Sequence, residues 1–148
     1  MKAFGAVPLL LLAGCCSTFD RDFAGSTTAA AGSPPFVGRW EGTWHSDPSG
    51  HAGSLRSIIT QTDSGFSARY YATFTFTFLL SLPLGFEMEV PLTAVRDGDA
   101  WRFRGSAVID YFIGDGLYEY EGLVAGDEFI ASYRTSFDSG VFRMTRVR

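Results

Sequence analysis

Cysteine, histidine and lysine are scarce in this 148-residue chain, and each scarcity excludes a class of site. The two cysteines are adjacent, at Cys15 and Cys16, so the rest of the chain has no disulfide and no cysteine-ligated metal. His45 and His51 are the only histidines, which limits the choice of a catalytic imidazole to these two. The chain also lacks a Gly-x-Ser-x-Gly motif and a phosphate-binding loop. We therefore expect no enzyme activity and no cofactor.

The two histidines flank Asp47 in the stretch HSDPSGH. Two imidazoles and a carboxylate can hold a divalent metal. The spacing matches no established metal motif, however, and the Ser, Asp, Pro and Gly residues are typical of a polar hairpin loop. We favour the loop and predict no metal site.

Positive charge is also sparse. Lys2 is the only lysine, and the residues from Cys15 onward carry eleven arginines against sixteen acidic residues, a formal charge of −5. A mildly acidic domain is poorly suited to nucleic acid or to an anionic membrane face as its main partner. We expect no nucleic-acid partner.

The apolar run at the N-terminus, residues 3–12, is too short for a spanning helix, which needs roughly 20 apolar residues. Lys2, this run and the small residues after it have the order of a secretory signal. At its end, Leu12-Ala13-Gly14-Cys15 resembles the bacterial lipobox. The resemblance implies cleavage after Gly14, a diacylglyceryl thioether on Cys15 and, since Cys16 is not an aspartate, sorting to the outer membrane. A plain secretion signal is the alternative.

These signals predict a signal peptide (residues 1–14), an anchored cysteine with a flexible linker (15–35) and a folded domain (36–148). The stretch from Ser17 to Pro35 is rich in small and polar residues and has no periodicity, which predicts a tether. Such a tether would span on the order of 25 Å and lift the domain clear of the lipid headgroups. The domain would then lie on the periplasmic or surface face of the outer membrane.

From Phe36 onward the hydrophobic period is two, and no segment of ten or more residues keeps a helical period. The clearest strand runs from Phe66 to Leu80. Seven shorter runs alternate in the same way: residues 36–45, 54–61, 86–95, 100–109, 117–124, 128–136 and 141–148. This order predicts an all-β, eight-stranded antiparallel up-and-down (meander) barrel, lipocalin-like, with its charged face outside. An open sheet or a ten-stranded barrel is the alternative.

Turn sequences between these runs predict the strand register. A two-residue turn makes the paired residue numbers add to an odd number, and three such turns place apolar residues beside apolar residues. Turns at residues 97–98, 115–116 and 126–127 pair Phe103 with Leu92, Tyr111 with Tyr120, and Tyr133 with Tyr120.

Gly38-Arg39-Trp40, at the start of the first predicted strand, resembles the Gly-x-Trp motif of the lipocalins (calycins). In that family the tryptophan closes one end of the barrel and packs against an arginine of the last strand, a role open here to Arg143 or Arg146. The chain departs from the family because it has neither the helix after the barrel nor the disulfide. Gly42-Thr43-Trp44 equally resembles the first strand of avidin-like barrels, so both resemblances stay open.

The predicted inward face combines small residues with large aromatic ones. Ala107, Gly122 and Ala131 are expected near one level on consecutive strands. Small residues opposite large ones either fill an eight-stranded barrel or leave a cavity. We favour a cavity or open mouth, because inward tyrosine hydroxyls are costly in a filled core unless each finds a partner. The predicted ligand-binding residues are Trp40, Tyr70, Trp101, Tyr118, Tyr120, Tyr133 and Gly122.

Two pairs of carboxylates, Glu87 with Glu89 and Glu119 with Glu121, stand roughly 7 Å apart on one face of a strand. Glycosidases use carboxylates at such separations. Both pairs point outward, where Arg102 and Arg104 are expected, so we predict solvated ion pairs instead.

The leading hypothesis is a lipid-anchored envelope lipoprotein whose barrel binds a small apolar or aromatic ligand, as a carrier or scavenger. The alternative is a filled barrel that binds an envelope protein through its loops. The stretch Ser81-Leu82-Pro83-Leu84-Gly85 favours that alternative, because as a loop it would expose two leucines. An enzyme is the third and least favoured class.

Overall fold

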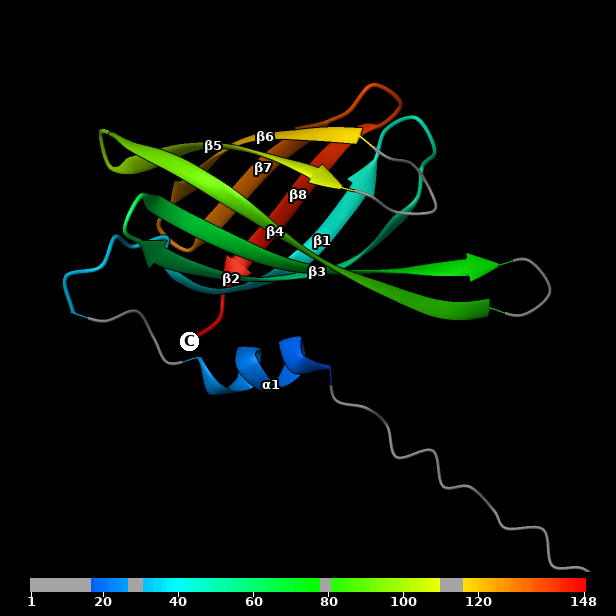
Figure 1. Cartoon of the computed structure of the whole chain (residues 1–148), viewed down its shortest axis with the longest axis horizontal. Coiled ribbons are helices and arrows are strands. Elements are labelled where there is room, and N and C mark those ends of the chain that lie inside the picture. The colour runs from blue at the N-terminus through cyan, green and yellow to red at the C-terminus, as the bar shows by residue number, and fades with distance from the viewer. Residues whose placement is uncertain (1–16, 27–30, 78–80, 110–115) are drawn as a thin grey trace, which may run out of the picture.

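The computed structural model describes residues 17–26, 31–77, 81–109 and 116–148. It confirms the predicted fold class: eight antiparallel strands follow one another in a meander, and the last pairs with the first to close the barrel (Figure 1). The elements are α1 (Thr18–Gly25), β1 (Gly38–Ser46), β2 (Ala52–Thr62), β3 (Gly65–Thr77), β4 (Ser81–Asp97), β5 (Ala100–Ile109), β6 (Gly116–Ala125), β7 (Glu128–Arg134) and β8 (Ser139–Arg146).

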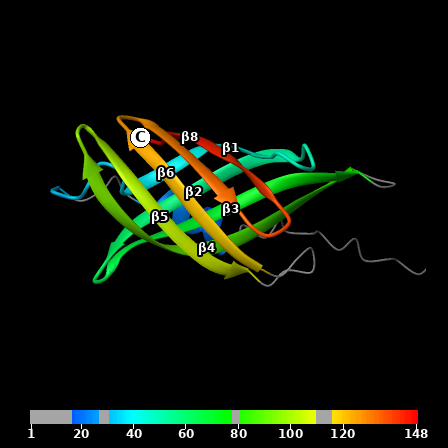
Figure 2. The same ribbon diagram turned by 90° about the horizontal axis from the view of Figure 1, so that it is seen from above.

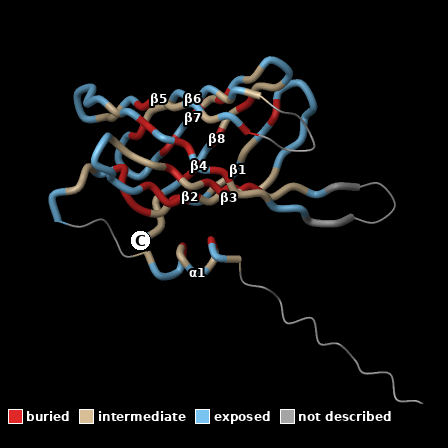
Figure 3. Tube along the Cα trace, viewed as in Figure 1, coloured by how far each residue is buried: buried red, intermediate tan, exposed pale blue. Residues whose placement is uncertain are grey.

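Strand alternation builds the core. In β3, Ala68, Tyr70 and Ala72 are buried inside the barrel, whereas Arg69 between them bonds to Glu87 on the outer wall. Figure 3 shows buried and exposed positions interleaved along the strands. The inward residues form one apolar cluster. Burial of this cluster is therefore the main stabilising term in a domain without disulfides.

One end of the barrel, which we call the closed end, is plugged by aromatic side chains. Phe36, just before β1, is buried with its ring centroid 4.6 Å from that of Phe66 and 5.2 Å from that of Trp101. Trp40 lies beneath the guanidinium of Arg146, 4.4 Å from Cζ to ring centroid. Of the two arginines that the lipocalin resemblance suggested, Arg146 therefore makes the contact. We call the opposite end the mouth.

The predicted register is confirmed at β6–β7, where Tyr133 pairs with Tyr120. It is wrong at β4–β5, where Phe103 pairs with Ala94 instead of Leu92, because the two turn residues are Gly98 and Asp99. It is also wrong at β5–β6, where Tyr120 pairs with Gly105; Tyr111 lies outside the described residues. Both shifts are by an even number of residues, so every inward residue stays inward.

From the mouth outward, β3 and β4 continue as a two-stranded arm, which we define as Thr73–Thr77 with Ser81–Gly85; at its base, Phe74 still packs on Trp44 of β1. The β2–β3 ladder ends at Ala72, whereas the β3–β4 ladder continues to the pair Thr77–Ser81. Figure 1 shows the two green strands projecting from the barrel. The loop predicted at residues 81–85 is therefore wrong, because these residues begin β4. The strand predicted from Phe66 to Leu80 is confirmed as far as Thr77, and residues 78–80 lie outside the described residues.

The seam between β4 and β5 opens toward the mouth. Their ladder covers only Leu92–Asp97 and Ala100–Gly105, whereas β5 stays paired with β6 up to Ile109. Figure 2 shows β4 and β5 diverging beyond this point.

The flexible tether predicted over Ser17–Pro35 is wrong in its first half, because residues 18–25 form α1. Ser17 caps the helix by accepting the N–H of Asp20 at 3.2 Å, and the Asp20 carboxylate accepts the N–H of Ser17 in return. Phe19 and Phe23 pack against Ile58 and Tyr71 on the outer wall of the barrel. Two apolar residues are too few to give a recognisable helical period. Within the described ranges, no helix is long and apolar enough to cross a membrane.

Candidate functional site

A cavity of about 140 Å³ lies inside the mouth. Every strand except β2 contributes to its wall, together with the β1–β2 and β7–β8 connections. Pockets that enclose drug-sized ligands measure roughly 300–1,000 Å³. This cavity therefore has room for one ring or a small branched group. The lining residues are Trp44, Ser46, Ser49, His51, Ala72, Phe74, Phe86, Met88, Ile109, Tyr118, Tyr120, Tyr133, Asp138 and Phe142.

Aromatic rings make most of this wall, in two groups. Tyr118 is half-buried and stacks against both Tyr120 and Tyr133, with 6.3 Å between ring centroids in each case. Across the cavity, Phe74 meets Trp44 and Phe86 edge to face, at 6.5 and 6.2 Å. Such a wall favours an apolar or aromatic guest, because stacking and edge contacts add to simple burial.

The polar groups of the cavity converge on Asp138, in the β7–β8 turn. Its Oδ1 accepts the hydroxyl of buried Ser46 at 2.7 Å and the backbone N–H of Ser139 at 2.8 Å, and its Oδ2 accepts the hydroxyl of Tyr133 at 3.0 Å. A carboxylate offers about four lone-pair positions. Among the described residues, one position on Oδ2 is therefore left for a ligand donor.

The tyrosine hydroxyls beside Asp138 are held in their neutral form. Burial and the negative charge of Asp138 raise the pKa of Tyr133, and the same two causes raise the pKa of Tyr118. Both side chains therefore stay protonated, and able to donate a hydrogen bond, up to a higher pH than an ordinary tyrosine.

Below the cavity the barrel is filled. A Cβ atom on Gly122 would meet the ring of Phe103 and the backbone of Ile130 and Ala131. Phe103 in turn packs on Phe129, with ring centroids 4.8 Å apart. The small residues thus make room for Phe103. Of the two arrangements considered from the sequence, a filled barrel describes the closed end and a cavity describes the mouth.

Of the seven predicted ligand-binding residues, Tyr118, Tyr120 and Tyr133 line the cavity. Trp40 and Trp101 lie at the closed end, and Gly122 lies under Phe103. Ala107 pairs with Tyr118, so it is not level with Gly122 and Ala131 as predicted.

Tyr70 is fully buried in the core, with its ring 6.2 Å from that of Tyr120 and 5.5 Å from that of Phe142. Its hydroxyl makes no hydrogen bond with any described residue, and burial raises its pKa. Tyr70 therefore supports the cavity from below without lining it.

Sequence reasoning missed the polar centre of the site. The sequence pattern singles out none of Asp138, Ser46 and Phe86 as candidate ligand contacts, although all three line the cavity. One signal was available. In a meander, the β1–β2 and β7–β8 connections lie at the same end, so the polar residues in these two connections can converge.

The two histidines are placed differently. His51 lines the cavity, whereas the side chain of His45 is half exposed, with its Nδ1 3.6 Å from Oδ1 of Asp47. Across the part of the chain that the structure describes, no three His, Cys, Asp or Glu residues are grouped to hold a metal. The HSDPSGH stretch forms the end of β1 and its connection to β2.

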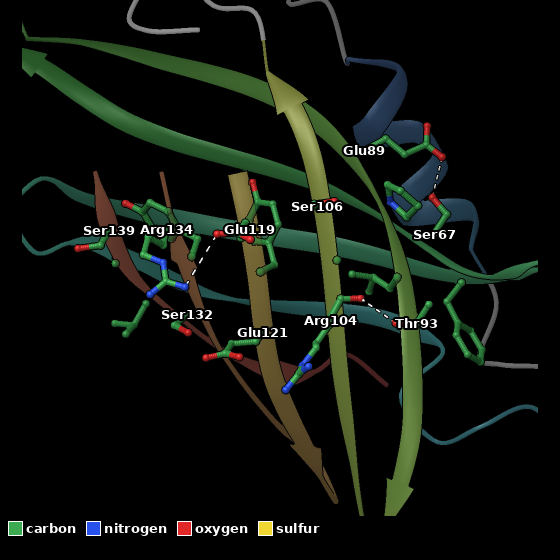
Figure 4. A pocket seen from close by; sticks show the side chains of 18 of the residues that line it. Ser67, Glu89, Thr93, Arg104, Ser106, Glu119, Glu121, Ser132, Arg134 and Ser139 are labelled. Carbon is green, nitrogen blue, oxygen red and sulfur yellow. Dashed lines mark hydrogen bonds and ion pairs between the residues drawn. The ribbon is translucent and has the colours of Figure 1, made fainter. Parts of the chain in front are cut away.

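A larger, open groove of about 1,420 Å³ lies on the outer wall across β3 to β8. Figure 4 shows Arg104, Glu119, Glu121 and Arg134 along it. Glu119 lies 3.9 Å from Arg134, and Glu89 accepts the hydroxyl of Ser67. These side chains face solvent, so the groove offers no enclosed site for a small ligand.

The predicted outward ion pairs exist, but with other partners. Glu87 pairs with Arg69, and Arg102 pairs with Asp97 rather than with a member of the two Glu pairs. Glu121 lies opposite Arg104 in the β5–β6 ladder. Because the carboxylates are exposed beside cations, they are poor candidates for acid–base catalysis.

No family model, no curated protein and no solved structure matches this chain. The site is therefore interpreted from its own geometry.

Proposed function

We propose that this chain is a lipid-anchored lipoprotein of the bacterial cell envelope whose barrel mouth binds a small ligand with an apolar or aromatic group. The observation that carries the binding proposal is the cavity of about 140 Å³ walled by aromatic rings. The anchoring part rests on the lipobox resemblance of Leu12-Ala13-Gly14-Cys15, which implies lipidation of Cys15 and location at the outer membrane. The protein would act there as a carrier or scavenger.

The residues of the cavity wall limit the chemical class of the ligand. Stacking against Tyr118 and Tyr133 requires a flat or compact apolar group, and the open position on Asp138 requires a hydrogen-bond donor on the same molecule. Since the cavity is small, a longer ligand would leave its remainder outside, through the mouth or the opened β4–β5 seam.

The first test is native mass spectrometry of residues 17–148, exported behind a cleavable secretion signal, purified without detergent and measured before and after solvent extraction. We expect a discrete extra mass that extraction removes. A bare polypeptide mass in every preparation, together with no binding of phenol or indole in titrations, would contradict the proposal.

Two alanines give a matched pair of variants. Ala72 lines the cavity, whereas Ala94 packs on the core near the closed end. Ala72→Leu fills the cavity and should abolish retention of the ligand, and Ala94→Leu should leave retention unchanged.

Asp138→Asn should weaken binding of the ligand about tenfold, because a charged acceptor contributes about 1.5–3 kcal/mol to a hydrogen bond. Equal retention by all three variants would show that the ligand binds elsewhere.

A further inference from the structure

Helix α1 is fastened to the outer wall by charge as well as by packing. Asp20 accepts Arg56 at 2.6 Å, and Asp22 accepts Arg69 at 2.9 Å. The hydrogen bonds from these arginines hold the pKa of Asp20 and of Asp22 below the usual carboxyl range, so both pairs are charged at neutral pH. The Arg56 guanidinium also lies over the ring of Phe19 at 5.5 Å. The helix therefore has a fixed direction on the barrel.

This direction points the N-terminus of α1 toward the mouth. The carbonyl of Phe23 accepts Arg39, which lies next to the closed end of β1. Phe19 instead stacks on Tyr71, which lies two residues beyond Arg69 toward the arm. Figure 1 shows the dark blue N-terminal end of α1 on the same side as the arm.

The length of the intervening chain allows the anchor to come near the level of the arm. Cys15 precedes Phe19 by four positions, which span at most about 14 Å of extended chain. From Tyr71, beside Phe19, the arm extends six residues to Thr77, or about 20 Å. A bilayer that holds acyl chains on Cys15 is therefore within reach of the end of the arm.

The arm also has the composition of a membrane contact. No charged residue occurs between Arg69 and Glu87 in the sequence. Leu84, in the arm, is 39% exposed. Of the other connections that the structure describes at the mouth, β1–β2 carries Asp47 and two histidines, and β7–β8 carries Asp138. The uncharged arm is therefore the element suited to lipid. Interfacial contact requires the arm to enter the bilayer by only about 5–10 Å. At that depth, the backbone N–H and C=O groups on the unpaired edges of the arm stay close to water.

We propose that the arm inserts into the interface of the bilayer that holds Cys15, so that the mouth faces the membrane. This inference rests on the proposed lipidation of Cys15 and adds a second membrane contact and an orientation. It replaces the domain lifted on a tether with a barrel held against the lipid, whose ligand enters from the membrane side.

The test uses two exposed residues of the same strand as matched label sites. Leu84 lies in the arm, and Val95, 64% exposed, lies at the other end of β4. The lipidated full chain with Cys16→Ser and either Leu84→Cys or Val95→Cys carries an environment-sensitive fluorophore on the new thiol. Each protein is reconstituted into phosphatidylethanolamine–phosphatidylglycerol vesicles with and without spin-labelled lipid.

We expect a blue-shifted emission and about twofold quenching by spin-labelled lipid at position 84, with neither at position 95. A water-like spectrum at position 84 in a chain that mass spectrometry shows to be lipidated would overturn the inference and leave the proposed anchor intact. A blue shift that appears only when envelope proteins are added would also overturn it, in favour of a protein partner. A chain without lipid on Cys15 would remove both the anchor and the inference.

Discussion

Trp40 and Arg146 form a stacked pair that depends on the shape of the guanidinium. Arg146 has only 16% of its side chain exposed, lies 4.4 Å above the indole, donates to the carbonyl of Val37 and pairs with Asp127 at 3.2 Å. A lysine cannot stack and donate in a plane at once. We expect Arg146→Lys to lower the free energy of unfolding by about 1–2 kcal/mol in urea titrations. Arg143→Lys, at an outward position, should change it by less than about 0.5 kcal/mol; equal losses would contradict this role.

Tyr70 tests the cost of an unpartnered hydroxyl. Because this buried group bonds to no described residue, Tyr70→Phe should raise the free energy of unfolding by about 1 kcal/mol. Tyr133→Phe removes the bond to Asp138 and should lower it by a similar amount, about 1 kcal/mol. Chemical denaturation of both variants measures the difference in sign. A loss of stability in Tyr70→Phe would show that its hydroxyl has a partner in solution.

The same residue predicts a loss of stability in alkali. Burial raises the pKa of the Tyr70 hydroxyl above its ordinary value of 10.0, so the unfolded chain loses this proton first as the pH rises. The contribution of Tyr70 to the free energy of unfolding is therefore complete below pH 10. Above pH 10 it declines by up to about 1.4 kcal/mol per pH unit. Urea titrations between about pH 9 and pH 11 measure the slope. Tyr70→Phe should have a shallower slope, and an unchanged slope would assign the effect to other groups.

At the scale of elements, the turn residues determine the strand register more closely than the hydrophobic pattern does. In Asp97-Gly98-Asp99, turns at 97–98 and at 98–99 both give odd sums and keep the same inward residues, so alternation cannot choose between them. Gly98 has a φ of +63°, and Gly126, in the turn that was predicted correctly, has a φ of +58°. Both glycines occupy the first central position, as in a type II′ turn. Applying this rule at Gly98 would have given the observed β4–β5 register.

Helix α1 could not be predicted by such a rule, because its stability lies in tertiary contacts with Ile58, Tyr71 and two arginines. Trypsin can test this docking, since Arg21 lies within the helix. Phe19 is fully buried, so Phe19→Ala should release the helix and raise cleavage after Arg21 at least about tenfold, with the barrel still folded by circular dichroism. Phe137→Ala, which changes an exposed ring near the mouth, is the control. Equal cleavage in both variants would mean that Phe19 does not hold α1.

At the scale of the whole molecule, closure and the inward face could be predicted from alternation and charge, but the open end could not. Inward aromatic residues occur toward both ends, Trp40 and Trp101 at one and Tyr118 and Tyr133 at the other. The fit of Phe103 against Gly122 and of Phe36 across the closed end determines which end of the barrel is filled. These contacts join residues distant in sequence, so local patterns do not contain them.

The unequal ends predict unequal dynamics. Close aromatic packing at the closed end raises the free-energy cost of local opening, whereas the cavity leaves fewer contacts to break at the mouth. In hydrogen exchange, amides of β1 near Trp40 and of β6 near Val124 should exchange at least about tenfold more slowly than those near Trp44 and Tyr118 on the same strands. A bound ligand should narrow this difference, because it fills the cavity and stabilises only the state in which the mouth is formed. Uniform protection along both strands in the ligand-free chain would mean that the mouth is as rigid as the closed end.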